Sequence, residues 1–260
     1  MEHHERALAV YVDLVRRDPA TLAVIAVGSV ARGTERPDSD VDVYLVVDDE
    51  AFDAALARNR LSWIERQDAV YAGGYVDVKL ASPRVLAAAA ENGDDPMRAS
   101  FEGARIAFQH GPGLGPVLQA IVTLPAAGWE ARVRAYLAQA RIHGGYFLPK
   151  ADEHGDAFLV QHAATHLALA TARAAFAERR TLFRGPKYVA ATLAALDLPD
   201  GFLDRWRELV ARPAADTGAR MLVAVEDWLG PALDHDDTLS TFIRDNELAW
   251  LLGTMPPEYR

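Results

Sequence analysis

Two short apolar runs, 22–27 and 41–47, mark the first half of the chain. Each has the length of a buried strand, and glycine and polar residues separate them. Apolar residues at helical spacing and a following proline predict a helix over 3–17. The same reasoning predicts strands at 62–71, 74–81 and 105–109 and helices at 50–59, 83–91, 97–103 and 114–122. Gly73-Gly74 is typical of a hairpin between the strands at 62–71 and 74–81.

The second half contains no convincing strand. Its apolar spacing predicts helices at 128–143, 156–180, 186–196, 200–211, 216–233 and 239–251. His143-Gly144-Gly145 is typical of a helix end capped by glycine. The boundary falls near 123–128, a segment that contains Pro125 and Gly128. We therefore predict an α+β fold, with a mixed β-sheet domain and flanking helices over 1–124 and an all-helical bundle over 125–260.

Composition narrows the classes of function. Half of the 260 residues are hydrophobic, and 37 acidic against 27 basic residues give a formal charge of −10. This charge disfavours nonspecific binding to nucleic acid, which depends on neutralising phosphates, and it suits a cationic small substrate. The chain has no cysteine, which excludes disulfides, thiolate metal sites and a cysteine nucleophile.

Targeting signals are not evident. The first residues, Met-Glu-His-His-Glu-Arg, lack the layout of a signal peptide, and no apolar run reaches about 18 residues, the length of a membrane span. We expect a soluble cytoplasmic protein with no membrane partner. The sequence does not indicate its oligomeric state.

The candidate chemistry lies around the second apolar run. Asp40 and Asp42 are two positions apart at its start, so in a strand their carboxylates project from one face. Carboxylates so close repel each other, and a divalent cation is the usual resolution. Asp38 shares the alternation but follows Pro37, and we predict that it is a solvated loop residue.

Gly28-Ser29 ends the first apolar run. Its backbone N–H groups and its hydroxyl suit phosphate oxygens. Arg32 is a further candidate, for phosphate or for an aspartate of the loop. Nucleotidyl transfer uses a metal site beside a phosphate site. In this reaction two Mg²⁺ ions about 4 Å apart bridge carboxylates and triphosphate.

This order of residues resembles a known family. Gly28-Ser29, a spacer of ten residues and Asp40-Val41-Asp42 before an apolar strand are similar to the nucleotidyltransferases of the DNA polymerase β superfamily. Within it, the chain looks most like small bacterial enzymes that adenylylate aminoglycoside and related antibiotics. Arg32-Gly33 and Ser39 also fit that subgroup. The resemblance implies ATP and Mg²⁺, and an active site between a nucleotidyltransferase domain and a helical bundle.

A third carboxylate is expected on a later strand. Asp77 lies in an alternating strand, on one face with Tyr75 and Lys79. The resemblance implies that Asp77 ligates a metal, accepts the proton of the incoming hydroxyl, or both, although the antibiotic enzymes often have glutamate there. Glu65 and Asp68 on the preceding strand are the fallback candidates.

Two cations of the helical half complete the expected site. Arg173 on one helix and Pro186-Lys187 at the start of the next resemble the region where the antibiotic enzymes meet the nucleotide phosphates. Arg184 is a nearby alternative. His162 and His166, at i and i+4, could share a metal, but no clear third ligand accompanies them, and we interpret them as a polar stripe.

The sequence thus predicts an Mg²⁺-dependent transferase that moves AMP from ATP to a hydroxyl of a small molecule, with aminoglycoside or lincosamide antibiotics as the first class by resemblance. Antibiotic resistance would be its role. Two alternatives stay open. The acceptor could be a protein or a tRNA, as in some toxin–antitoxin pairs, or the chain could be a nucleotide-binding module without catalysis.

Overall fold

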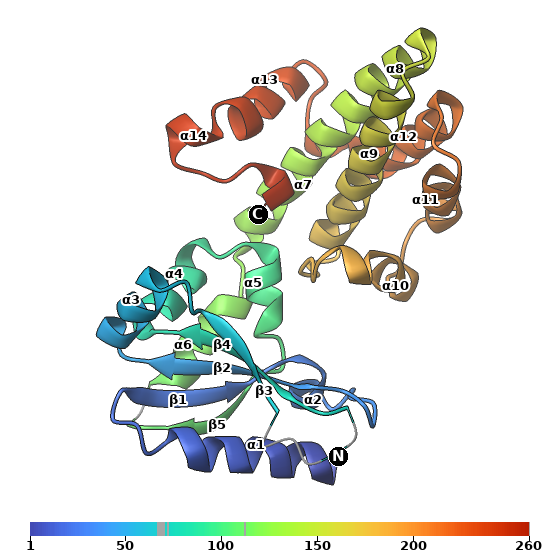
Figure 1. Cartoon of the computed structure of the whole chain (residues 1–260). Coiled ribbons are helices and arrows are strands. Elements are labelled where there is room, and N and C mark those ends of the chain that lie inside the picture. Colours follow the sequence, from blue (N-terminus) through green and yellow to red (C-terminus); the bar gives the residue numbers. More distant parts are fainter. Residues whose placement is uncertain (67–70, 72, 112, 260) are drawn as a thin grey trace. The chain divides into compact units, whose positions relative to one another are not determined.

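The computed structural model describes all residues except 67–70, 72, 112 and 260. The chain forms two compact units, Met1–Thr123 and Leu124–Arg260. The first unit contains the sheet, and the second is built from helices (Figure 1). This arrangement confirms the predicted α+β class. Among the described residues, no helix combines the length and the apolar character that crossing a bilayer requires.

The first unit is a five-stranded mixed sheet with helices on both faces. The strand order is β3-β4-β2-β1-β5, with β2 and β4 parallel and the other neighbours antiparallel. Its elements are α1 (Glu2–Val15), β1 (Thr21–Ala26), α2 (Gly28–Arg32), β2 (Val41–Val47), α3 (Asp49–Ala57), β3 (Ser62–Glu65), β4 (Val76–Ala81), α4 (Pro83–Asn92), α5 (Asp95–Ser100), β5 (Arg105–Gln109) and α6 (Leu114–Val122).

Both faces of the central strands are buried, which explains why β1 and β2 are continuous apolar runs rather than alternating ones. Val24 and Val43 pack in one core cluster with residues of α1 such as Leu8. Ile25 and Tyr44 point to the opposite face and pack in a second cluster with residues of α4, α5, α6 and the segment between them. The sheet is therefore held between two layers, and its edges are where polar groups can reach solvent.

The second unit contains α7 (Ala126–Ile142), a π-helical turn (His143–Phe147), α8 (Leu148–His154), α9 (Ala157–Glu178), α10 (Val189–Ala195), α11 (Phe202–Ala211), α12 (Ala215–Leu229), α13 (Thr238–Phe242) and α14 (Ala249–Leu252). The 3₁₀ turns Pro186–Tyr188 and Gly230–Ala232 and a second π-helical turn, Ile243–Glu247, lie between these helices, and the 3₁₀ turn Pro257–Tyr259 follows α14.

The helix α9 is the centre of this unit. Asp156 caps its start by accepting a hydrogen bond from the Leu159 N–H at 3.0 Å. Most residues from Ala163 to Ala177 are buried on all sides, and a helix that is apolar all round is a core helix. The Trp206 indole of α11 donates to the Ala168 carbonyl at 2.8 Å, which fixes α11 against α9.

The predicted helix end at His143-Gly144-Gly145 is wrong. The chain stays helical through a π-helical turn and continues into α8. Packing explains these glycines better than capping does: a Cβ on Gly144 would lie 3.0 Å from Leu167 Cδ1. The glycine lets α9 approach closely, and the helix ends only at Gly155, which has a φ of 64°.

Candidate functional site

The end of β1 and the start of β2 lie at one edge of the sheet, because the two strands are antiparallel with Ala26 opposite Val43. The Val27 N–H donates to the Asp42 carbonyl at 3.0 Å. Gly28 follows directly, with a φ of 70°, and a Cβ there would collide with the Asp42 carboxylate, 2.9 Å from its Cγ. Both the backbone conformation and the close approach require glycine at this position.

The register of β2 and β4 brings the third carboxylate to the same place. The strands are parallel, and Asp42 is the partner of Asp77. One carboxylate oxygen from each of Asp40, Asp42 and Asp77 lies within 4.8 Å of the others, and all three residues are partly buried. Hard divalent cations such as Mg²⁺ take oxygen ligands of this kind. The three aspartates, called here the carboxylate triad, are therefore a candidate metal site.

The electrostatics of the triad show why it would attract a cation. Burial, followed by the charge of Asp40, raises the pKa of Asp42 from 3.8 to about 6, while Lys79 acts in the opposite direction. The charge of Asp77 adds to the rise, and that of Arg32 opposes it. Three clustered carboxylates are thus costly to keep ionised, and a bound cation would relieve that cost.

Tyr75 and Lys79 also act on the triad. The Tyr75 hydroxyl donates to Asp40, and this hydrogen bond raises the pKa of the tyrosine. The alternation over 75–79 predicts both residues on the face of Asp77, but it does not indicate that either one interacts with Asp40 or Asp42. Both interactions depend on the pairing of β4 with β2, which the local pattern does not reveal.

Ser29 and Arg32 lie on α2, a short helix that the sequence pattern does not predict. The turn is closed by Gly33, whose φ is 69°, and by the Ser29 carbonyl, which accepts from the Thr34 N–H at 3.0 Å. Both Ser29 and Arg32 are partly buried. The stem of Arg32 packs on Gly103, since a Cβ there would lie 2.8 Å from Arg32 Cγ. Gly28, Ser29, Arg32 and Asp42 thus form one neighbourhood.

Asp38 and Glu65, the other acidic candidates that the structure describes, are not part of the triad. Asp38 is exposed in the loop and accepts from Arg36 Nε at 3.2 Å. Glu65 ends β3 opposite Val76, and within the described residues the group of potential metal ligands includes Asp77 rather than Glu65. Asp68 lies outside the described residues.

Arg173 and Lys187 have different surroundings in the helical unit. Arg173 is only 4% exposed, and its guanidinium lies 4.5 Å from the centroid of the Tyr136 ring and 4.6 Å from that of Phe183. It lines a cavity of about 200 Å³ together with His166. Lys187 is exposed in the 3₁₀ turn before α10, and Arg184 is also exposed. The rings of His162 and His166 are 4.2 Å apart on α9.

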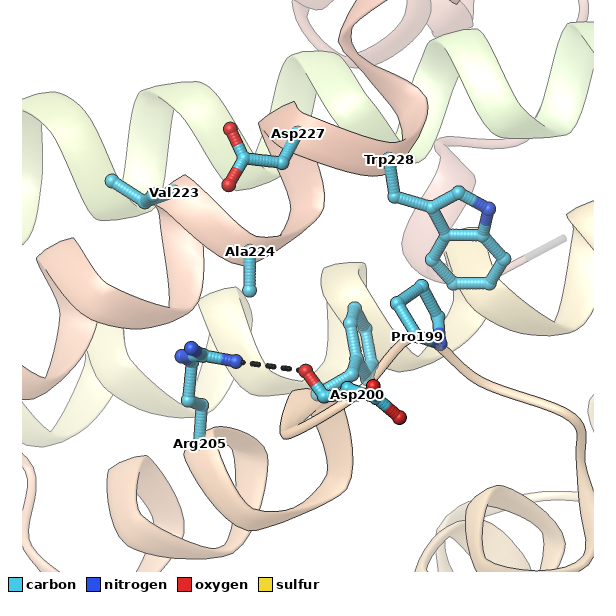
Figure 2. Close-up of a pocket in the computed structure, with 8 residues that line it drawn as sticks. Pro199, Asp200, Arg205, Val223, Ala224, Asp227 and Trp228 are labelled. Carbon is cyan, nitrogen blue, oxygen red and sulfur yellow. Dashed lines mark hydrogen bonds between the residues drawn. The ribbon is translucent and has the colours of Figure 1, made fainter.

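Another hollow, of about 280 Å³, lies where the start of α11 meets α12 (Figure 2). Its walls include Asp200, Asp227 and Trp228, and Arg205 Nη1 donates to the Asp200 carbonyl at 3.2 Å. None of the predicted site residues lines it. We therefore build the chemistry on the carboxylate triad.

Comparisons with known proteins bear on the same part of the chain. Residues 10–91 match the family model of the nucleotidyltransferase domain, a stretch that includes Gly28 and the whole triad. Among solved structures, a nucleotidyltransferase-like protein from Exiguobacterium sibiricum aligns over 94% of this chain and 80% of its own, with 16% identity and a TM-score of 0.50. At that identity the likeness shows the fold alone. No curated protein sequence matches the chain.

Proposed function

We propose that the protein is an Mg²⁺-dependent nucleotidyltransferase that moves AMP from ATP to a hydroxyl of a small molecule. The observation that carries the proposal is the carboxylate triad, which the structure gathers within 4.8 Å inside the segment that matches the nucleotidyltransferase domain. Its position beside Gly28, where backbone without a side chain can approach phosphate closely, supports the proposal.

The residues present fit a divalent cation. Asp40, Asp42 and Asp77 supply three oxygen donors on one face, and burial together with the neighbouring carboxylates raises the pKa of Asp42, a cost that a cation would relieve. When bound, Mg²⁺ would neutralise triphosphate charge and stabilise the pyrophosphate leaving group. Lys79 contributes a fixed positive charge near Asp42. The site is therefore arranged for electrostatic stabilisation and positioning.

Gly28, Ser29 and Arg32 are assigned to the phosphates. The Ser29 hydroxyl and nearby N–H groups would donate to phosphate oxygens, and the Arg32 guanidinium, whose charge already acts on Asp42, would pair with one of them. Arg173 and Lys187 are proposed as further nucleotide-binding residues. The cavity beside Arg173 and the exposure of Lys187 support this assignment.

The transfer itself is a displacement at the α-phosphorus. The acceptor hydroxyl forms the new oxygen–phosphorus bond while the bond to pyrophosphate breaks, and Asp77 takes the hydroxyl proton. Asp77 is the partner of Asp42 across two parallel strands, so an acceptor at Asp77 is also close to the other ligands. The charge of −10 supports a cationic acceptor, and aminoglycoside- or lincosamide-type antibiotics are the first class to test.

The test is incubation with ATP, Mg²⁺ and a panel of hydroxylated antibiotics, with pyrophosphate and product mass as readouts. We expect pyrophosphate release that depends on an acceptor, and a product heavier by one AMP moiety. The Asp40→Asn, Asp42→Asn double variant should lose both signals, and Asp38→Asn is the matched control because Asp38 is an exposed aspartate of the same segment.

Two results would redirect the proposal. Pyrophosphate release that persists in the double variant would remove the triad from the chemistry. A labelled protein or tRNA in lysate given labelled ATP, with no labelled small molecule, would move the acceptor to a macromolecule.

A further inference from the structure

The segment that leads into Asp40 is tied to the first helix of the chain. His4, on α1, is fully buried, and its Nε2 lies 3.1 Å from the Ser39 carbonyl oxygen. The Tyr71 hydroxyl donates to the same oxygen at 2.7 Å. The two groups come from segments 35 and 32 residues away from Ser39 in sequence. One carbonyl thus receives two long-range hydrogen bonds.

The tautomer of His4 follows from this contact. A carbonyl oxygen only accepts, so Nε2 must carry the hydrogen and donate it. Within the part of the chain that the structure describes, His4 Nδ1 is buried and has no hydrogen-bond partner. Burial, together with the nearby His3 imidazole, lowers the pKa of His4, so the ring is neutral at pH 7. His4 therefore acts as a single, fixed donor.

The Tyr71 ring, which is partly buried, packs against both histidines. The Tyr71 and His4 rings meet edge to face with centroids 4.9 Å apart, and the His3 ring lies 4.7 Å from Tyr71. Gly74 packs closely against the same ring, since a Cβ on Gly74 would lie 2.6 Å from Tyr71 Cε1. A donor so constrained loses little freedom when it makes its hydrogen bond.

The carbonyl of Ser39 belongs to the peptide group whose nitrogen is that of Asp40. The Ser39 hydroxyl also accepts from the Arg36 N–H at 2.9 Å and closes the preceding turn. On the other side of Asp40, the Val41 N–H donates to the Tyr75 carbonyl at 3.0 Å and begins the pairing of β2 with β4. Asp40 thus stands between two peptide groups that are both fixed.

We propose that His4 and Tyr71 are positioning residues, which hold the Ser39–Asp40 peptide so that the Asp40 carboxylate keeps its place beside Asp42 and Asp77. This inference rests on the proposed function, since it assigns Asp40 to the metal. Neither residue touches the substrate in this account. They act through one backbone carbonyl, in the way that partners of a metal ligand orient it from outside.

The test measures Mn²⁺ binding without nucleotide, through the electron paramagnetic resonance signal of the free ion. The variants are Tyr71→Phe, His4→Phe and the double variant, which keep a ring and remove the donors. Tyr44→Phe is the matched control: Tyr44 is buried in the same unit, and its hydroxyl lies 3.2 Å from Ser100 Oγ. Thermal unfolding in chelator checks that each protein is folded.

We expect the double variant to bind Mn²⁺ about tenfold more weakly, with smaller losses in the single variants, and Tyr44→Phe to bind like the unaltered protein. A purely structural role would lower the thermal midpoint and leave the affinity of the folded protein unchanged. Equal affinity in all these proteins overturns the positioning role alone. Failure of the unaltered protein to bind Mn²⁺, or unchanged binding by Asp42→Asn, overturns the proposed function as well.

Discussion

Gly28 lies directly against the carboxylate of Asp42: the space that a Cβ would need is already taken by the aspartate. The contact arises because β1 ends where β2 begins, and the positive φ of Gly28 turns the chain away from the sheet at that point. The turn that we propose for phosphate and the strand that we propose for the metal are thereby joined at one residue.

Gly28→Ala should therefore abolish activity. The new methyl group must displace the Asp42 carboxylate or shift β1, and the positive φ adds strain of about 1 kcal/mol. We expect at least about a 100-fold loss of pyrophosphate release, because the loss of a direct ligand exceeds the 10–100-fold cost of disturbing its partners. Steady-state assays with the folded variant measure this.

Gly33→Ala distinguishes the two possible causes of the loss in Gly28→Ala, which are backbone strain and crowding of Asp42. Gly33 has nearly the same φ, 69°, but a Cβ there would have no described atom within 4 Å. It should lower the thermal midpoint like Gly28→Ala and keep its activity. If both variants lose activity equally, backbone strain rather than crowding of Asp42 is the cause.

Removing the charge of Asp42 should stabilise the fold at neutral pH. The pKa of Asp42 is about 6 in the folded protein against 3.8 ordinarily, so the folded state holds the proton more tightly. Stability from this group is present below about pH 4 and is lost as the pH rises through 6. The free energy of unfolding falls by about 1–3 kcal/mol as a result.

In chelator at pH 8, Asp42→Asn should thus unfold at a higher temperature than the unaltered protein, and the difference should vanish near pH 4. Added Mg²⁺ should raise the midpoint of the unaltered protein more than that of the variant. A variant that is less stable than the unaltered protein at pH 8 would contradict this electrostatic account.

Lys187→Ala should weaken nucleotide binding without loss of stability, because Lys187 is exposed. Loss of one charge-assisted contact to phosphate predicts about a tenfold rise in KM for ATP. Arg173→Lys keeps the charge but loses the planar group that lies against Tyr136 and Phe183, and it should also raise KM. Lys150→Ala is the control for Lys187, since Lys150 is an exposed lysine of the same unit. Unchanged KM in both Lys187→Ala and Arg173→Lys would remove the helical unit from nucleotide binding.

The stability of the helical unit should depend on the ion pair between Arg141 and Glu226. Arg141 is 7% exposed, and it donates to both carboxylate oxygens of Glu226 at 2.6 and 2.9 Å. Glu226→Gln leaves the buried cation without its counter-charge and should cost about 3 kcal/mol. Urea unfolding followed by tryptophan fluorescence measures this loss of stability, because four of the five tryptophans lie in the helical unit.

Glu208→Gln is the comparison, because its pairs with Arg212 and Arg220 are exposed. It should leave the unfolding curve unchanged. Equal effects of the two substitutions would mean that the Arg141 pair is not buried as described.

The sequence predicts the fold well where long apolar patterns exist. The strands at 41–47 and 105–109 and the helix at 114–122 have the predicted bounds, because an apolar run or a sustained period marks them. The five-residue helix α2 was missed, since one turn is too short to show a period. The π-helical turn at His143–Phe147 was missed because glycines that serve packing look like glycines that serve capping.

The candidate site, like the fold, can be predicted from the sequence only in part. Asp40 and Asp42 follow from alternation within one strand, and Asp77 from a resemblance, but the register that pairs Asp42 with Asp77 is a tertiary fact. The contacts of His4 and Tyr71 with Ser39 span more than 30 residues and carry no local signal. Local patterns thus indicate the candidate residues for the chemistry, whereas the contacts that surround these candidates emerge only from the packed fold.

The most direct test of the central claim is anomalous diffraction from a crystal with Mn²⁺ and a nonhydrolysable ATP analogue. We expect a Mn²⁺ peak about 2.0–2.2 Å from carboxylate oxygens of Asp40 and Asp42, with Asp77 beside it and the triphosphate against Gly28-Ser29. A bound nucleotide whose metal lies away from these three aspartates would contradict it.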